Sequence, residues 1–289
     1  MKQQKIRVIL QRKVYIIVAV VLFYLSSAAG LWAQKKRVVT LAPALTEIVF
    51  ALGKGDCLVG NTKFCNYPEA AKHIPRVGGL IDVNVEVLIN KKPDIIFLYR
   101  ENYESVKVME QRSRLVFVKH TNLHDIFAGI MVVAQALDVP EKGKGLVTTI
   151  KNELQALHTK STGKKPLKTL LIIGRSPDKL SNMYIVGKKD FLNELMVIAG
   201  GCNAYQGEIL YPSISMESVV AMNPDVIIEL SAYNESIPAS QVYELWKKYP
   251  FIPAVKTGKI NIIDNSIWII PGPRVAQIAQ FMFDIYWGK

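Results

Sequence analysis

Residues 84–98 read NVEVLINKKPDIIFL, and residues 215–229 repeat the pattern 131 residues later as SMESVVAMNPDVIIE. Besides the apolar positions, three residues recur at this offset: Glu86, Pro93 and Asp94 return as Glu217, Pro224 and Asp225. A second pair of segments precedes these copies in the same order, LTEIVFALG at 45–53 and LNELMVIAG at 192–200. An ordered repeat with insertions between its parts predicts two similar lobes in tandem. Ligands commonly bind in a cleft between such lobes.

Short β-branched runs alternate with amphipathic stretches after residue 33. The strands that we predict are 37–41, 94–98, 114–118, 169–174, 225–230 and 260–264. Alternation of strands and helices is typical of parallel sheets with helices packed on their faces, so each lobe is expected to be an α/β unit. Pro93 and Pro224 each lie just before a strand, where a missing amide proton is tolerated.

The two lobes are expected to be joined by one long helix. The segment EKGKGLVTTIKNELQALHTK follows Pro140 and has no turn signal from Leu146 onward. It places four apolar residues on one face, Leu146, Ile150, Leu154 and Leu157, which predicts a helix of about twenty residues and roughly 30 Å. We therefore assign 34–140 to an N-terminal lobe, 141–165 to the connecting helix and 166–289 to a C-terminal lobe. A rigid helical connection predicts small lobe motions rather than wide closure.

The first 33 residues have the composition of a secretory signal. Five basic residues (Lys2, Lys5, Arg7, Arg12 and Lys13) precede the apolar run VYIIVAVVLFYL, and small residues follow at 26–30. Cleavage after Ala29 or Ala33 would release the chain into the periplasm. The alternative is an uncleaved membrane anchor, because 14–29 is close to the shortest stretch that can span a bilayer. No cysteine lies at the cleavage region, which argues against lipid attachment there.

Charge and cysteine content narrow the class of protein further. Segment 1–33 contains five Lys or Arg and no acid, so the formal charge of the remainder is +7 rather than +12. Export and the lack of a basic run with interleaved aromatic residues argue against a nucleic-acid partner. Cys57 and Cys65 are close enough in sequence to close a short disulfide loop, with buried thiols as the alternative, and Cys202 is in the other lobe.

The sequence contains no pattern that supports catalysis or metal binding. The four histidines, His73, His120, His124 and His158, do not combine with a carboxylate or cysteine at a recognised spacing. There is no P-loop, no GxGxxG after a strand and no GxSxG. We therefore predict no catalytic residue, no metal site and no cofactor. The alternative from a different class is a secreted or membrane-anchored enzyme or structural protein on the same two-lobed fold.

A family resemblance follows from several motifs in one order. These are RVVTLAPALTEIVFALGKGDCLVG at 37–60, TKFCNYP at 62–68, VxxLxxxKPDIIF at 85–97, the long helix, GKKDFLNELMVIAGGCN at 187–203 and YPSISMESVVAMNPDVII at 211–228. Together they resemble the periplasmic binding proteins of cobalamin, haem and iron-siderophore ABC importers, and the cobalamin-binding proteins look closest. The resemblance covers essentially all of the chain after residue 33. It implies two α/β lobes joined by a long backbone helix, and a monomer.

The resemblance gives the repeated glutamates a role in docking. In the family, one acidic residue on each lobe meets arginines of the dimeric inner-membrane permease, which works with its ATPase, and Glu86 and Glu217 occupy the matching positions. Two equivalent sites suit a twofold partner. The alternative is local: Asn84 and Ser215 are expected to be helix N-caps, and an acid in the first turn interacts favourably with the positive helix end. Both interpretations are compatible.

The resemblance also points to residues that line the ligand cleft. By analogy these are Phe64, Tyr67, Leu80, Tyr211, Trp268 and Arg274. Aromatic rings offer broad apolar contact to a flat macrocycle. The alternative for Tyr67 and Trp268 is a place in the lobe cores. The chain departs from cobalamin binders at Leu80, where they have a tryptophan, and at Phe64, which replaces a tyrosine.

Three ligand classes require different side chains in that cleft. An anionic catecholate siderophore requires several cations, for which Arg76, Arg100, Arg175 and Arg274 are candidates. Haem requires an axial Tyr or His, for which Tyr99, Tyr103 or Tyr184 are candidates. Cobalamin requires mainly apolar walls and amide hydrogen bonds. The expected function is therefore capture of a small molecule, cobalamin or another corrinoid first and haem or a ferric siderophore second, for an ABC importer.

Overall fold

The computed structural model describes residues 35–231 and 238–288. The expected signal segment at 1–33, and with it the alternative membrane anchor, lies outside the described residues. The fold below is that of the unit Arg37–Lys289. Within the described ranges, no helix combines the length and the apolar character needed to cross a membrane.

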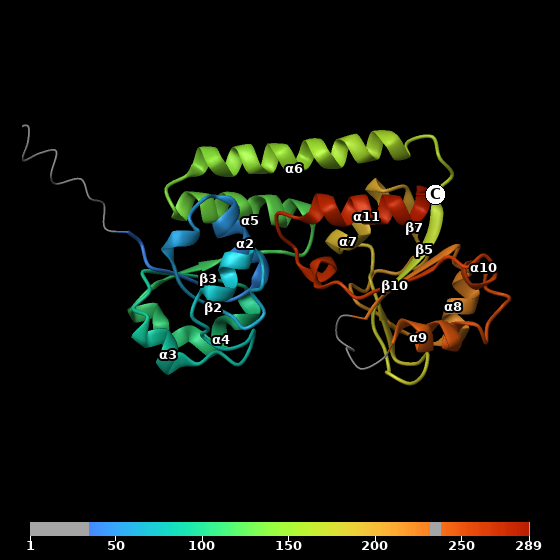
Figure 1. Ribbon diagram of the computed structural model, residues 1–289, viewed down its shortest axis with the longest axis horizontal. Coiled ribbons are helices and arrows are strands. Elements are labelled where there is room, and N and C mark those ends of the chain that lie inside the picture. The colour runs from blue at the N-terminus through green and yellow to red at the C-terminus, as the bar shows by residue number, and fades with distance from the viewer. Residues whose placement is uncertain (1–34, 232–237, 289) are drawn as a thin grey trace, which may run out of the picture. The chain divides into compact units, whose positions relative to one another are not determined.

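The N-terminal lobe is a parallel sheet covered by helices on both faces. Its strands are β1 (Val38–Thr40), β2 (Leu58–Asn61), β3 (Ile95–Leu98) and β4 (Arg114–Phe117), in the order β2-β1-β3-β4. Helices α2 (Pro43–Ala51) and α5 (Leu123–Ala136) cover one face, and α3 (Val85–Asn90) and α4 (Tyr103–Val106) lie on the other (Figure 1). Successive strand residues point to opposite faces: Val38 packs in one core cluster and Val39 in another.

The C-terminal lobe repeats this plan with a mixed sheet. Its strands are β5 (Leu167–Gly174), β6 (Met183–Ile185), β7 (Gly201–Asn203), β8 (Ser213–Ile214), β9 (Val226–Leu230) and β10 (Ile260–Ile263). The order is β10-β9-β5-β6-β8, with β7 beside β5. Strands β7, β9 and β10 pair in parallel, whereas β6 pairs antiparallel with both β5 and β8. The expected parallel pairing therefore does not extend to this edge, where β6 is antiparallel, and the short strands β2, β6, β7 and β8 were not predicted.

Helices cover both faces of the second sheet as well. Helices α7 (Phe191–Ile198) and α11 (Val275–Trp287) share a core cluster with one face, and α8 (Met216–Met222), α9 (Ala239–Trp246) and α10 (Pro253–Lys256) pack on the other. Short 3-10 turns complete the chain: η1 (Gly55–Cys57), η2 (Glu69–His73), η3 (Arg100–Asn102), η4 (Lys107–Gln111) and η5 (Ser266–Ile269).

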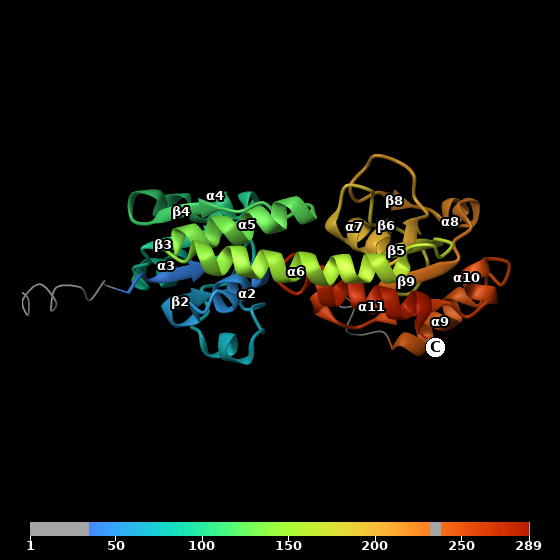
Figure 2. The same cartoon turned by 90° about the horizontal axis from the view of Figure 1, so that it is seen from above.

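One long helix, α6 (Pro140–Ser161), follows the first lobe and leads into the second. Proline at its first turn needs no intrahelical acceptor, and Ile150, Leu154 and Leu157 are buried on the face that the sequence predicts. Figures 1 and 2 show α6 beside α5 at one end and beside α11 at the other. A β-carbon at Gly143 would lie 2.5 Å from Cβ of Ala134 on α5, so glycine permits this close approach. The two-lobed α/β fold with a connecting helix is confirmed.

The aspartates of the repeat have the same structural role in both lobes. The Asp94 carboxylate accepts the backbone N–H of Arg37 at 2.7 Å, and the Asp225 carboxylate accepts that of Lys168 at 2.9 Å. In return, the backbone N–H of each aspartate donates to the carbonyl of the same partner, at 2.8 Å and 2.7 Å. Each aspartate therefore fixes the start of the first strand of its lobe against the strand at the end of the repeat.

The cysteines form no disulfide among the described residues. Cys57 and Cys65 are buried thiols, which is the alternative that the sequence left open, and Cys202 is partly buried. The Cys65 sulfur lies 3.1 Å from the hydroxyls of Thr46 and Thr62, so its thiol belongs to a buried polar cluster.

Candidate ligand site and docking surfaces

Large apolar side chains are exposed at the carboxyl ends of both sheets, most of them on loops and one, Tyr184, in β6. Between 38% and 75% of each is exposed, and they are Phe64, Tyr67, Leu80 and Ile81 in the N-terminal lobe and Tyr184, Ile209 and Tyr211 in the C-terminal lobe. In parallel sheets, ligand sites form at this edge. Four of the six predicted ligand contacts, Phe64, Tyr67, Leu80 and Tyr211, belong to this set, which we call the edge aromatic and aliphatic set.

Arg76 holds the loop that carries Phe64 and Tyr67. One terminal nitrogen of its guanidinium donates to the side-chain oxygen of Asn61 at 2.7 Å and to the carbonyls of Thr62 and Cys65 at 2.8 Å and 3.0 Å. Three acceptors satisfy that nitrogen within the protein. Arg76, which was predicted as a cation for an anionic ligand, therefore has a structural role.

Arg274 connects the two lobes at this edge. Its Nε donates to Glu47 Oε2 at 2.8 Å and its Nη2 contacts Glu47 Oε1, so a residue at the start of α11 is paired with a carboxylate of α2. The guanidinium carbon also lies 3.9 Å from the ring centroid of Tyr67. Burial raises the pKa of Glu47, and the hydrogen bond and charge of Arg274 oppose that rise. Arg274, a predicted ligand contact, is therefore engaged within the protein by the Glu47 carboxylate and the Tyr67 ring.

Tyr211 is oriented by a buried carboxylate. Its hydroxyl donates to Asp190 Oδ2 at 2.6 Å, and Asp190 Oδ1 accepts the backbone N–H of Leu192 at 2.8 Å as the N-cap of α7. Asp190 is 1% exposed, and burial raises its pKa to about 6. The hydrogen bond fixes the hydroxyl end of Tyr211 while 45% of the side chain remains exposed.

Trp268 differs from its prediction as a cleft residue. It lies in η5, is 2% exposed and stacks on Phe281 with ring centroids 6.5 Å apart. Its ring borders a hollow of about 570 Å³ that Asp264, Asn265 and Asp284 also line. An indole that is buried to this extent offers little surface to a ligand, so Trp268 belongs to the core, the alternative that the sequence left open.

Most other candidates for anion or haem recognition are engaged inside their own lobe. The Arg175 side chain is 3% exposed, pairs with Glu229 at 2.7 Å and donates to the carbonyls of Ser176 and Pro177. Tyr99 stacks on His120 with ring centroids 3.9 Å apart, and burial raises its pKa.

Two of the remaining three candidates, Arg100 and Tyr103, lie together near the end of β4. The guanidinium carbon of Arg100 is 5.0 Å from the ring centroid of Tyr103 and 5.4 Å from that of Phe117. A hydrogen bond to Glu110 raises the pKa of the Tyr103 phenol. Of the three tyrosines considered for an axial bond, Tyr184 is the one with half of its side chain exposed.

The two repeated glutamates occupy equivalent exposed positions. Glu86 lies in the first turn of α3 and Glu217 in the first turn of α8. The expected caps are present: the Asn84 side chain accepts the N–H of Val87 at 3.0 Å, and the Ser215 hydroxyl accepts the N–H of Ser218 at 3.4 Å. A separate hydrogen bond between the side chains of Ser215 and Glu217 lowers the pKa of the Glu217 carboxyl group.

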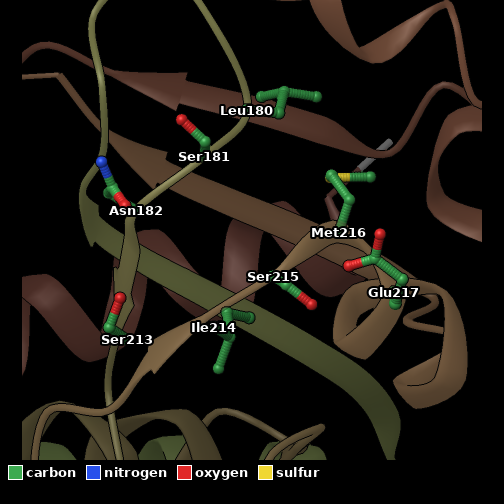
Figure 3. Close-up of a pocket in the computed structure, with 8 residues that line it drawn as sticks. All are labelled: Leu180, Ser181, Asn182, Ser213, Ile214, Ser215, Met216 and Glu217. Carbon is green, nitrogen blue, oxygen red and sulfur yellow. The ribbon is translucent and has the colours of Figure 1, made fainter.

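Glu217 also borders a surface hollow of about 470 Å³. Figure 3 shows its carboxylate and Met216 on one side and the loop with Leu180, Ser181 and Asn182 on the other. Ser213, Ile214 and Ser215 form the floor between them.

Sequence reasoning did not identify Glu47, Asp190 or Glu194 as site residues. A signal was available for two of them, because Glu47 and Glu194 occupy the same position in LTEIVFALG and LNELMVIAG. Across residues 35–231 and 238–288, no group of three or more His, Cys, Asp or Glu side chains is arranged to hold a metal ion.

Comparison with known proteins identifies relatives along most of the chain. A family model described as "Periplasmic binding protein" matches residues 38–267. The Bacillus subtilis protein named "Uncharacterized ABC transporter substrate-binding lipoprotein YvrC" is 27% identical over 261 residues, which cover 88% of this chain and 81% of that protein. The vitamin B12-binding protein of Salmonella typhimurium is 28% identical over 249 residues, which cover 84% and 87%.

Solved structures show the same fold. The periplasmic heme-binding protein HutB of Vibrio cholerae matches with a TM-score of 0.78 and 20% identity, over 88% of this chain and all of that one. The periplasmic vitamin B12-binding protein BtuF of Vibrio cholerae matches with a TM-score of 0.71 and 23% identity, over 86% and 96%. At these identities the likeness concerns the fold.

Proposed function

The chain belongs to the periplasmic binding protein family, and we propose that it captures cobalamin or another corrinoid and delivers it to the permease of an ABC importer. The observation that supports this proposal is the edge aromatic and aliphatic set, which presents apolar surface from both lobes. The family is described as periplasmic binding proteins, one relative is named as an ABC transporter substrate-binding lipoprotein and another as a vitamin B12-binding protein, so the protein is a binding protein and not an enzyme.

A nearly neutral ligand fits the side chains that remain available. Arg76, Arg175 and Arg274 donate to acceptors within the protein. A catecholate siderophore would have to compete for these cations, and a buried pair that loses one partner is strongly destabilised. Cobalamin carries its own axial ligand and needs mainly apolar walls and amide contacts, and the exposed rings of Phe64 and Tyr67 supply apolar wall.

Haem is the second candidate, and the exposed phenol of Tyr184 favours it. Tyr184 lies in β6 beside the carboxyl end of β5, where a planar ligand between the lobes would meet it. Tyrosine is an accepted axial ligand of haem iron. Names of the fold neighbours include haem binders as well as B12 binders, so the ligand must be tested directly.

Docking on the importer is assigned to Glu86 and Glu217. Both carboxylates are exposed on the first turn of a capped helix, one in each lobe. Duplicate sites of one charge suit a permease dimer with two equivalent basic surfaces, and such complementarity sets register and encounter rate. The permease would act in the inner membrane with its ATPase, and the binding protein would work from the periplasm as a monomer.

Calorimetric titration of the chain from residue 34 onward tests the ligand. We expect saturable one-to-one binding of cyanocobalamin, and Phe64→Ala should weaken it about tenfold, the factor for roughly 1.4 kcal/mol of lost aromatic contact. The matched control is Phe251→Ala, a ring that is 61% exposed near α10. Saturation with haemin but not cyanocobalamin would replace the ligand with haem, and silence with both would contradict both assignments.

A further inference from the structure

The second pair of repeated segments carries a glutamate that crosses between the lobes. Glu47 is the third residue of LTEIVFALG on α2, and Glu194 is the third residue of LNELMVIAG on α7. We infer that these two glutamates form reciprocal ties, each holding the N-terminus of the last helix of the opposite lobe, and that the ties set the spacing of the lobes. A positioning role for Glu47 toward Tyr67 rests on the proposed function; the ties do not.

The first tie runs from the N-terminal lobe to the start of α11. Both carboxylate oxygens of Glu47 pair with Arg274, the N-cap residue of α11. The side chains are 3% and 17% exposed, so the pair is largely shielded from solvent and salt. The two chain segments also approach each other closely at this contact, because a β-carbon at Gly272 would lie 3.2 Å from Cβ of Ala44 on α2.

The second tie runs in the opposite direction, from the C-terminal lobe to the start of α5. Glu194 Oε2 accepts the backbone N–H of Leu123, the first residue of α5, at 2.6 Å. The N–H of Phe191 at the start of α7 donates to the carbonyl of Thr121 at 2.8 Å. The first N–H groups of a helix have no intrahelical acceptor and carry partial positive charge, so a carboxylate from the other lobe satisfies both needs.

The two ties are equivalent positions of the internal repeat. Helices α2 and α7 contain the repeated segment, and α5 and α11 are the last helices of their lobes. Each lobe thus contributes one glutamate carboxylate to a helix of the other lobe, and its own last helix binds the glutamate of that lobe. Both receiving helices also pack against α6 (Figure 2). The two ties therefore act beside α6 in linking the lobes.

The Glu47 tie extends to the ligand edge. Arg274 lies between Glu47 and Tyr67, with its guanidinium carbon 3.9 Å from the tyrosine ring centroid. A cation over a ring is attracted to the face of that ring, and the carboxylate fixes where the cation lies. Glu47 therefore acts on Tyr67 through Arg274 and is a positioning residue rather than a ligand contact.

Distance measurement between spin labels tests the ties without any ligand. Labels on Val108→Cys and Lys256→Cys, both exposed, report lobe separation in the full chain with Cys202→Ser as background. We expect Glu47→Gln and Glu194→Ala each to broaden the distance distribution, and the control Glu153→Gln, on the exposed face of α6, to leave it unchanged. Equal distributions in all variants would overturn the inference.

Amide exchange at Leu123 separates the tie from a general loss of structure. Glu194→Ala should speed this exchange about tenfold, as expected when one charge-assisted hydrogen bond is lost, while Glu194→Gln retains an acceptor oxygen without the charge and should speed it less. The double variant Glu47→Gln/Arg274→Gln leaves no unpaired charge and serves if the single variant does not fold. Unchanged exchange in Glu194→Ala would contradict the second tie, whereas a failed cobalamin titration would contradict the ligand alone.

Discussion

Replacement of Asp190 by asparagine should change how stability depends on pH. Asp190 is buried at the start of α7, where it accepts hydrogen bonds from Tyr211 and Leu192, and burial raises its pKa from 3.8 to about 6. The folded state therefore binds this proton more tightly than the unfolded state between these two pKa values. Stability from this group is fully present below pH 3.8 and is lost as the pH rises through 6.

The magnitude follows from the two pKa values. Between pH 4.5 and pH 7, a carboxyl group with these values lowers the free energy of unfolding by about 2 kcal/mol. The asparagine side chain would carry no charge, could accept from Leu192 through its oxygen and could donate to the Tyr211 hydroxyl through its amide nitrogen. The variant should thus lack this component of the pH dependence and be more stable than wild type near pH 7.

Urea unfolding followed by circular dichroism at pH 4.5, 5.5, 6.5 and 7.5 measures this difference. Asp178→Asn, on an exposed loop of the same lobe, is the matched control and should follow wild type. The reasoning would be refuted if Asp190→Asn and wild type changed in parallel across this range, because the raised pKa would then contribute nothing to folding.

Three further outcomes are expected. In thermal unfolding, Gly143→Ala should cost about 1–3 kcal/mol because its methyl group would overlap Ala134, whereas Gly145→Ala, with nothing within 4 Å, should be neutral or slightly stabilising. Asp94→Ala should destabilise by about 1 kcal/mol through the lost acceptor for the first strand, and equal melting temperatures would contradict that role. Glu86→Lys with Glu217→Lys should abolish transport in reconstituted vesicles while ligand affinity stays near wild type, and unchanged transport would remove the docking assignment.

The fold was predictable because its determinants are local and repeated. Strand runs, the face of α6 defined by Ile150, Leu154 and Leu157, and the caps Asn84 and Ser215 all depend on neighbours within a few turns. Strands β6 and β8 were not predicted because they are short and pair antiparallel at a sheet edge, where pairing rather than composition defines them.

The sequence predicted several exposed side chains of the candidate site, but not which candidates are buried or already paired within the protein. Phe64, Tyr67 and Tyr211 are exposed on the expected loops, which follow from the position of the strands. Burial of Trp268 depends on its packing against Phe281 of α11, a contact that sequence spacing does not reveal. Sequence likewise identifies an arginine as a cation but does not show that Arg175 is paired with Glu229, 54 residues away.

The two pairs of repeated acids show which contacts a sequence repeat can predict and which it cannot. Asp94 and Asp225 bond to the first strand of their own lobe at the same separation of 57 residues, so one copy predicts the other. Glu47 and Glu194 are repeated equally well, yet one meets a guanidinium and the other a backbone N–H, because each partner belongs to the opposite lobe. Duplication preserved the position of each carboxylate, whereas the arrangement of the two lobes around α6 determined its partner. A repeat therefore predicts the contacts that its residues make within a lobe. Contacts between the lobes can be predicted only once the packing of the last helices is known.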